Sequence, residues 1–417
     1  MFYFCPVEFN LADLFESVAD AIPEREALIC ADRRLTYAQL DERATRVASH
    51  LRDAGVRPGE HVGLYLYNGT EYVETVLGCL KIRAVPINVN YRYVEHELRY
   101  LFANADLVGI VYQQEFAPRI AAARGDVPDL RHLVYVEDES GVDAAGGGAV
   151  PFADVLASGS PDRDFEPRSG DDLFIIYTGG TTGLPRGVMW QQEDMFFSAM
   201  GGGNPTGPPI EHPEQLAENA KGRTQVVQFP IPPLIHGAST LGVFIGMNWG
   251  DRVVLIRKFD PALAWEMVDR EKVNTITIVG DAMARPMAEA LAANPRAWDT
   301  SSLVYLGSAG AVLSESVKQE LQALLPSTIV TENFGATETG FQGMAAPKTD
   351  GASAPMRFFM NERTAVLDDD LKPVAPGSGV TGRLALRGRI PLGYYGDPEK
   401  TAATFVEVNG QRWVLPG

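Results

Sequence analysis

The chain has 417 residues and a formal net charge of −18, with 45% hydrophobic and 22% charged residues. This length exceeds what one compact core usually holds, so two or three subdomains of a globular protein are expected. A strongly negative surface repels polyphosphate, which argues against nucleic acid as a partner. An anionic substrate would therefore need a local positive or donor-rich site.

Three scattered cysteines, Cys5, Cys30 and Cys79, show no paired or metal-binding spacing, which fits a reducing compartment. The first ten residues lack the basic start and apolar centre of a signal peptide. No run of about 18 apolar residues predicts a membrane-spanning helix. The sequence thus predicts a cytoplasmic protein without a transmembrane segment, and leaves peripheral membrane contact and a homodimer open.

Strand-like and helix-like segments alternate along most of the chain, a rhythm typical of parallel sheets covered by helices. Strands are predicted at 61–67, 84–90, 107–112, 132–138, 173–177, 225–230, 251–256, 274–280, 301–307 and 328–335. Helices are predicted within 34–56, where Thr36 is the N-cap, and at 71–82, 95–105, 237–247, 261–272, 281–293 and 314–325. So many strands rarely share one open sheet, so two sheets are expected.

The sequence pattern changes near residue 360, where short β-prone runs are separated by Pro and Gly. The last residues predict a hairpin around Asn409 and Gly410. The expected organisation of 1–417 is therefore two α/β subdomains over about 1–360 and a small antiparallel β subdomain over about 361–417.

The stretch "YTGGTTGLPRGV" begins at Tyr177, at the end of an apolar strand. Its glycines let backbone N–H groups approach an anion, its threonines add hydroxyl donors, and Arg186 adds a permanent charge. It matches neither a Walker loop nor a dinucleotide fingerprint. A phosphate cradle is favoured, with a flexible surface loop as the alternative.

Three further stretches contain candidate functional residues, but each stretch alone is only weak evidence of a site. "TENFGATETG" places Thr337 and Glu338 after a strand. These two residues are either magnesium ligands beside a phosphate or part of an ordinary solvent-exposed turn. "LGSAGAVLS" offers small residues for a flat ligand or a tight turn. His236 in "FPIPPLIHGAS" begins a helix, where it meets a carboxylate or only packs.

Together, and in their order along the chain, these stretches and "GRLALRGRIPLGYYGDPEKTAATF" resemble the adenylate-forming superfamily, most closely bacterial fatty-acid–CoA ligases. The resemblance covers nearly the whole chain. It implies two flavodoxin-like, mostly parallel sheets and a small distorted antiparallel β-barrel. It also implies a two-step ligase reaction: a carboxylic acid and ATP give an acyl-adenylate and pyrophosphate, then coenzyme A takes the acyl group and AMP leaves.

The resemblance also assigns roles to residues. Thr337 and Glu338 would act on the α-phosphate and Mg²⁺, with Thr178 as a second metal ligand, and His236 would lie beside the acyl carboxylate. The nucleotide site would include Thr178, Gly179, Gly180, Thr181, Thr182, Gly183, Arg186, Ser308, Gly310, Ala311, Glu332, Asn333, Phe334 and Gly335, with Phe334 stacked on adenine. The acyl pocket would include His236, Gly237, Val279, Gly280, Asp281 and Gly310.

The chain departs from the family pattern in three places. Gly179 stands where serine is usual, and Arg186 where lysine is usual; arginine keeps the charge with altered geometry. The chain ends before the aspartate that would bind ribose and before the small lid domain. If 417 residues were the whole protein, it would be nearly inactive; a trimmed form of a longer enzyme is favoured, with a non-catalytic nucleotide- or acyl-adenylate-binding module as the alternative.

The acid is expected to be hydrophobic, either a fatty acid or a steroid side-chain acid. Relatives that activate amino acids place an aspartate where this chain has His236, so an amino acid is disfavoured. A luciferase-like role shares the first half-reaction and stays open. Asp281 is a polar exception in the expected pocket wall, and is interpreted as the cap of its own helix or as a contact to the acid.

Overall fold

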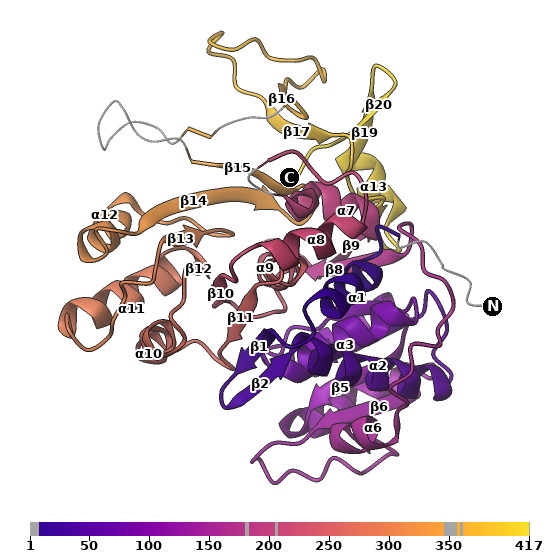
Figure 1. The fold of residues 1–417 in the computed structure, drawn as a ribbon. Coiled ribbons are helices and arrows are strands. Elements are labelled where there is room, and N and C mark those ends of the chain that lie inside the picture. The colour runs from indigo at the N-terminus through magenta and orange to yellow at the C-terminus, as the bar shows by residue number, and fades with distance from the viewer. Residues whose placement is uncertain (1–7, 180–182, 205–206, 346–356, 359–361, 417) are drawn as a thin grey trace.

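The computed structural model describes residues 8–179, 183–204, 207–345, 357–358 and 362–416. Within these residues, two eight-stranded sheets and one four-stranded sheet form the framework (Figure 1). The first sheet has the order β18-β9-β8-β4-β3-β5-β6-β7. Its strands are β3 (His61–Tyr65), β4 (Val85–Asn88), β5 (Leu107–Gln113), β6 (His132–Val136), β7 (Val150–Pro151), β8 (Leu173–Thr178), β9 (Arg186–Gln191) and β18 (Gly393–Tyr394).

The second sheet has the order β15-β14-β13-β12-β10-β11-β1-β2, with parallel pairing from β14 to β1 and antiparallel strands at both edges. Strand β1 comes from the start of the chain but pairs with β11, in the register Cys30–Leu255. The strands are β1 (Glu26–Cys30), β2 (Arg33–Thr36), β10 (Val227–Pro230), β11 (Arg252–Leu255), β12 (Thr275–Ile278), β13 (Tyr305–Ser308), β14 (Ile329–Ala336) and β15 (Gly340–Met344).

Helices separate and cover these sheets. The largest apolar cluster of the described residues lies between the two sheets and includes residues of α1, α2, α3 and α9. A second cluster joins α10, α11 and α12 to the outer face of the second sheet, and a third joins α4 and α5 to the first sheet. The helices are α1 (Leu11–Ala21), α2 (Tyr37–Asp53), α3 (Thr70–Lys81), α4 (Glu95–Asn104), α5 (Ala117–Ala123), α6 (Phe152–Ser158), α7 (Gln192–Ala199), α8 (Glu214–Gly222), α9 (Gly237–Asn248), α10 (Pro261–Glu271), α11 (Gly280–Ala293), α12 (Glu315–Leu324) and α13 (Pro398–Thr404).

The local signals in the sequence explain several of these bounds. Thr36 caps α2 as predicted, in a capping box with Gln39. Asn409 and Gly410 both have positive φ, as a tight hairpin between β19 and β20 requires. Strand β13 begins only at Tyr305, later than predicted, because Ser301 and Ser302 form a turn and Val304, just before the strand, is exposed.

The antiparallel tail is a four-stranded sheet of order β16-β17-β20-β19, drawn in yellow at the top of Figure 1. Its strands are β16 (Thr364–Leu367), β17 (Arg383–Arg387), β19 (Phe405–Val408) and β20 (Gln411–Val414). Among the described strands no pair joins β16 to β19, so this sheet is open and the expected barrel closure is not found. The same segment also sends β18 back to the first sheet, beside β9.

An ion network fixes the inner helices to the segment that precedes β8. Lys81 of α3 is fully buried, and its Nζ lies 2.5 Å from Glu16 Oε1 and 2.7 Å from Asp41 Oδ1. Arg168 reaches the second Glu16 oxygen at 2.5 Å, and Arg163 reaches the second Asp41 oxygen at 2.7 Å. The network therefore ties α1, α2 and α3 to the long 159–172 connection.

No helix in the described part of the chain is both long and apolar enough to cross a membrane. The longest of these helices, α2, has 17 residues and carries charged side chains along its exposed face. Its apolar face is buried among α1, α3 and the sheets.

Candidate active site

A cleft of about 670 Å³ opens where the carboxyl ends of strands from both sheets face one another. In parallel sheets this edge is the usual place for ligands, because loops there can carry side chains without disturbing the core. Helix α9 forms one wall of the cleft. The cleft gathers ten of the residues predicted for the site: Thr178, Gly179, His236, Gly237, Val279, Gly310, Asn333, Phe334, Gly335 and Thr337.

Other predicted residues are described but do not line this cleft: Gly183, Arg186, Gly280, Asp281, Ser308, Ala311, Glu332 and Glu338. Gly180, Thr181 and Thr182 lie outside the described residues. The roles assigned to both groups stay predictions.

The Gly/Thr loop connects β8 to β9, which pair antiparallel with Thr178 opposite Arg186. No helix begins after the loop, so its donors are not supported by a helix dipole as they are in a Walker loop. Gly187 is required by packing, because an added Cβ would lie 2.6 Å from the ring of Tyr177. Thr178 and Gly179, the first residues of the loop, stand at the cleft wall.

The turn after β14 is held from two sides. The indole Nε1 of buried Trp190 donates to the Thr337 carbonyl at 2.9 Å. The hydroxyl of Tyr394 donates to Glu338 Oε1 at 2.8 Å, and burial together with the charge of Glu338 raises the pKa of Tyr394. Gly335 is required here, because an added Cβ would lie 2.2 Å from the Gly340 carbonyl oxygen.

The donors available to a metal ion are few. Among the described residues no group of three or more His, Cys, Asp and Glu side chains could hold one. Glu338 Oε2 and the Thr178 hydroxyl have no hydrogen-bond partner in the described part of the chain. One carboxylate and one hydroxyl fit Mg²⁺, which usually takes one or two protein oxygens together with substrate phosphates and water.

His236 is the N-cap of α9, as predicted, and is exposed at the cleft. Partial desolvation by the surrounding walls, and secondly the charge of Arg92, lower the pKa of its imidazole. The ring is therefore neutral at neutral pH. Gly237, the next residue, lies close to the Thr337 hydroxyl: a Cβ added there would be 4.0 Å from Oγ1. The start of α9 and the turn after β14 thus meet across the cleft.

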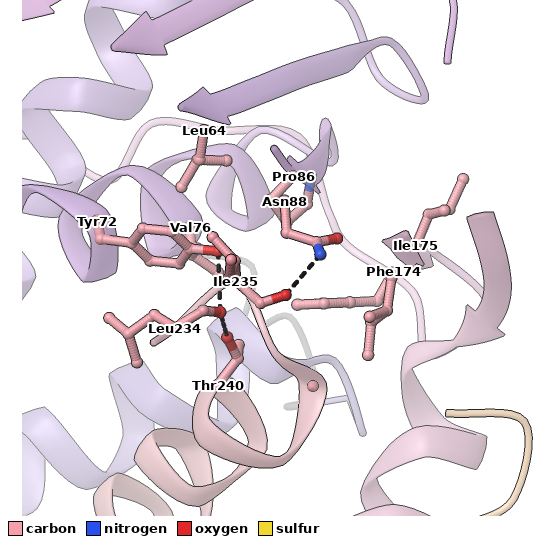
Figure 2. Close-up of a pocket in the computed structure, with 12 residues that line it drawn as sticks. Leu64, Tyr72, Val76, Pro86, Asn88, Phe174, Ile175, Leu234, Ile235 and Thr240 are labelled. Carbon is pink, nitrogen blue, oxygen red and sulfur yellow. Dashed lines mark hydrogen bonds between the residues drawn. The ribbon is translucent and has the colours of Figure 1, made fainter. Parts of the chain in front are cut away.

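The loop before His236 is pinned by side chains that the sequence did not single out. Figure 2 shows the Leu234 carbonyl between the hydroxyls of Tyr72 and Thr240, at 3.1 and 2.5 Å, and Asn88 Nδ2 bonded to the Ile235 carbonyl at 2.7 Å. These groups surround a cavity of only about 10 Å³, so the loop has little room to move.

Asn88 also binds the strand that leads into the Gly/Thr loop. Its Oδ1 accepts from Tyr177 N at 2.7 Å and its Nδ2 donates to Tyr177 O at 2.8 Å, besides the bond to Ile235. One side chain therefore connects the end of β8, in the first sheet, to the loop that carries His236.

The 308–314 segment follows β13 and is anchored to α11. The Ser308 hydroxyl accepts from Gly280 N at 2.9 Å, and Gly310, with a φ of 78°, lines the cleft. The interpretation of Asp281 as the cap of its own helix is wrong, because the N-cap of α11 is Val279 and Asp281 lies in the first turn. Asp281 Oδ1 instead accepts from Ser314 N at 2.7 Å, which fixes the start of the next helix.

Two more predicted nucleotide residues lie on β14. Glu332 is buried and its Oε2 lies 3.7 Å from Lys318 Nζ of α12, away from the cleft lining. Phe334 lines the cleft and packs on Phe358, with 5.1 Å between ring centroids. Phe334 is therefore available to a nucleobase on the cleft side, and its stacking on adenine stays a prediction.

Arg186 begins β9, and its Nε lies 3.0 Å from Asp397 Oδ2. Asp397 is also the N-cap of α13 and accepts from Lys400 N at 2.9 Å. Both partners of the ion pair are partly exposed, so the pair contributes little to stability. The guanidinium is charged and held at the base of the loop, outside the cleft lining.

Replacing Arg186 by lysine should leave the Kd for ATP within a few-fold, because the charge is kept and the weak ion pair with Asp397 can re-form. Titration calorimetry with ATP on both proteins checks this. A change of several orders of magnitude would show that Arg186 has a different role.

Sequence reasoning missed several residues of the cleft: Asn88, Tyr93, Trp190, Gln228, Leu241 and Ile245. Asn88 is the last residue of the buried strand β4, a position at the carboxyl edge of a parallel sheet that could have been singled out. Leu241 and Ile245 lie four residues apart on α9, on the same face as Gly237. No pattern in the sequence separates Gln228 from an ordinary polar residue of a strand.

Comparison with known proteins agrees with this geometry. A profile of the AMP-binding enzyme family matches residues 15–395. The chain is 44% identical, over 415 residues, to the medium/long-chain-fatty-acid–CoA/3-oxocholest-4-en-26-oate–CoA ligase of Mycobacterium tuberculosis, covering 99% of this chain and 75% of that protein. It is 44% identical to the 3-oxocholest-4-en-26-oate–CoA ligase of Rhodococcus rhodochrous, covering 98% and 75%.

Among solved structures, the anthranilate–CoA ligase AuaEII in complex with anthranoyl-AMP is similar in fold, with a TM-score of 0.80 and 22% identity over 99% of this chain and 78% of that one. The matched family profile, the two-sheet architecture and the cleft between the sheets lead to one assignment. This chain belongs to the AMP-binding enzyme family.

Proposed function

We propose that this protein is an acid–thiol ligase that activates a hydrophobic carboxylic acid with ATP and transfers the acyl group to coenzyme A. The observation that carries the proposal is a single cleft that contains His236, Thr337, Phe334 and the start of the Gly/Thr loop. The substrates named for the two relatives, medium- and long-chain fatty acids and a steroid side-chain acid, give the substrate class.

The proposed chemistry has two steps. A carboxylate oxygen of the acid attacks the α-phosphorus of ATP, the bond to the bridging oxygen of the β-phosphate breaks, and pyrophosphate leaves. The thiol of coenzyme A then gives up its proton and attacks the acyl carbon, and AMP leaves with the carboxyl oxygen. The chain's own residues bind and orient the reactants, because positioning accounts for much of such catalysis.

The roles follow from the contacts described above. The neutral His236 imidazole lies beside the acid and adds no positive charge that would hold the carboxylate. Thr337, fixed by Trp190, points its hydroxyl toward the start of α9, where the carboxylate and α-phosphate would meet. Glu338 and Thr178 would hold Mg²⁺, which when bound neutralises charge on the phosphates.

The remaining parts of the proposal concern the setting of the reaction. We place it in the cytoplasm, in lipid metabolism, because Cys30 and Cys79 are both unpaired and the relatives are named for fatty and steroid acids. A homodimer stays a prediction.

Glu338→Gln tests the assignment. The amide still accepts from Tyr394 but loses the charge, so ATP–pyrophosphate exchange by the full-length gene product should fall about 100-fold or more. Glu218→Gln, on α8 outside the cleft, serves as the matched control and should exchange like the wild type. Absence of exchange by the wild type with every medium-chain, long-chain or steroid acid would contradict the ligase assignment and favour a binding module.

A further inference from the structure

The cleft continues along α9, away from His236. Gly237, Ala238, Leu241, Gly242 and Ile245 line it, all on one face of the helix. A Cβ added to Gly246 would lie 3.3 Å from Cδ and 3.4 Å from Oε1 of Gln228, so the Gln228 amide lies against the third turn of α9. At 1.5 Å per residue, this turn is about 13 Å along the helix from Gly237. Gln228 therefore marks the end of the cleft remote from His236.

The Gln228 amide is held in one orientation. Its Nε2 donates to Asp251 Oδ2 at 2.6 Å. Asp251 is fully buried, accepts from Val226 N at 3.1 Å, and lies 3.3 Å from Arg223. Burial raises the pKa of Asp251 to about 6, so the carboxylate is ionised at neutral pH and can only accept. The amide NH₂ must then face Asp251, which leaves Oε1 as the free end.

Gln228 Oε1 has no hydrogen-bond partner among the residues that the structure describes, and Gln228 lines the cleft. Leu241 and Ile245 form the apolar side of the cleft on α9, and Thr277, on the strand paired with that of Gln228, also lines the cleft. An apolar chain placed here would displace water from Gln228 Oε1 without replacing its hydrogen bond, whereas a hydroxyl would donate a hydrogen bond to Oε1. A buried acceptor that loses its partner is costly, by about 10- to 100-fold in affinity.

We propose that Gln228 makes this ligase prefer acids that carry a hydrogen-bond donor, such as a hydroxyl, about 13 Å from the carboxylate. The inference rests on the proposed function and narrows its substrate class. A site that hydrogen-bonds a substrate hydroxyl rejects the analogue without it far better than an apolar pocket rejects a missing methylene.

Calorimetry on the 417-residue chain tests this without turnover. The probes are non-hydrolysable acyl-sulfamoyl adenosines with straight chains from octanoyl to dodecanoyl, each with and without a terminal hydroxyl. At the chain length that reaches Gln228, the hydroxyl should tighten binding by about 10-fold or more. Gln228→Leu should remove this difference and strengthen binding of the all-apolar probe.

Gln225→Leu is the matched control, since Gln225 lies just before the same strand and its amide bonds to Glu26 O and Gly250 O, away from the cleft lining. This control should keep the preference for the hydroxyl. Equal binding of each probe pair by the wild type would overturn the inference even if a variant failed to fold, and so would a preference that survives Gln228→Leu. If no probe binds, the proposed function itself fails, and this inference with it.

Discussion

Lys81→Met should destabilise the protein by about 3–5 kcal/mol. The ammonium is fully buried between Glu16 and Asp41, at 2.5 and 2.7 Å. Removing it leaves two carboxylates in a low-dielectric interior with only part of their compensation, from Arg168 and Arg163. Guanidinium unfolding followed by tryptophan fluorescence measures the change.

Lys272→Met is the matched control. Lys272 also lies between two carboxylates, Asp269 and Asp299 at 2.9 and 3.0 Å, but on the surface. Solvent screens that pair of contacts, so the control should unfold like the wild type. Equal destabilisation by both variants would show that burial of Lys81 is not what makes its network important.

The same network predicts how the Lys81→Met effect depends on pH. Burial alone would raise the pKa of Glu16, but Lys81 and Arg168 outweigh it and lower that pKa to about 2. A lowered carboxylate pKa contributes stability above the ordinary value of 4.5, and this contribution is lost as the pH falls toward 2. The stability difference between wild type and Lys81→Met should therefore shrink over this range, and a constant difference would contradict the assignment.

Asn88→Asp should lower ATP–pyrophosphate exchange by the full-length gene product about 100-fold. The change keeps an acceptor for Tyr177 N but sets carboxylate oxygens against the carbonyls of Tyr177 and Ile235, where Nδ2 now donates. The loop that carries His236 should shift relative to the end of β8. Misplacement of about 1 Å is enough for a loss of this size.

Asn294→Asp controls for the change of amide to carboxylate, since Asn294 is exposed at the end of α11 and should leave exchange and melting temperature unchanged. Melting temperature reports whether Asn88→Asp still folds. A folded Asn88→Asp protein with wild-type exchange would show that Asn88 does not position the site.

Much of the fold could be predicted because its signals are local. The alternation of apolar strands and amphipathic helices indicates parallel sheets, and the Pro-rich turn before His236 places the start of α9 correctly. The partner of each strand is not a local property. Nothing within Glu26–Cys30 says that it will pair with β11 of the second sheet, because pairing depends on residues that lie far along the chain.

The site residues also divide into those that local sequence predicts and those that depend on distant partners. Thr178, His236 and Thr337 belong to stretches with recognisable composition, and the cleft gathers them. Asn88 and Gln228 act through side-chain bonds to distant backbone or to a buried carboxylate, at Ile235 and Asp251, so their importance appears only once the partners are in place. For Asp281 the local sequence is misleading. Its place next to a helix start suggests a cap of that helix, but its carboxylate accepts a hydrogen bond from Ser314 N.

The pairing of β1 with β11 has a consequence for synthesis on the ribosome. Cys30 and its partner Leu255 are 225 residues apart. At about 5–20 residues per second, the β1–β2 pair must wait about 10–45 s before its sheet can form. During this time the edge that β11 will cover is open to other nascent chains. Chaperone capture should therefore concentrate on this early segment, and release should follow the emergence of β11.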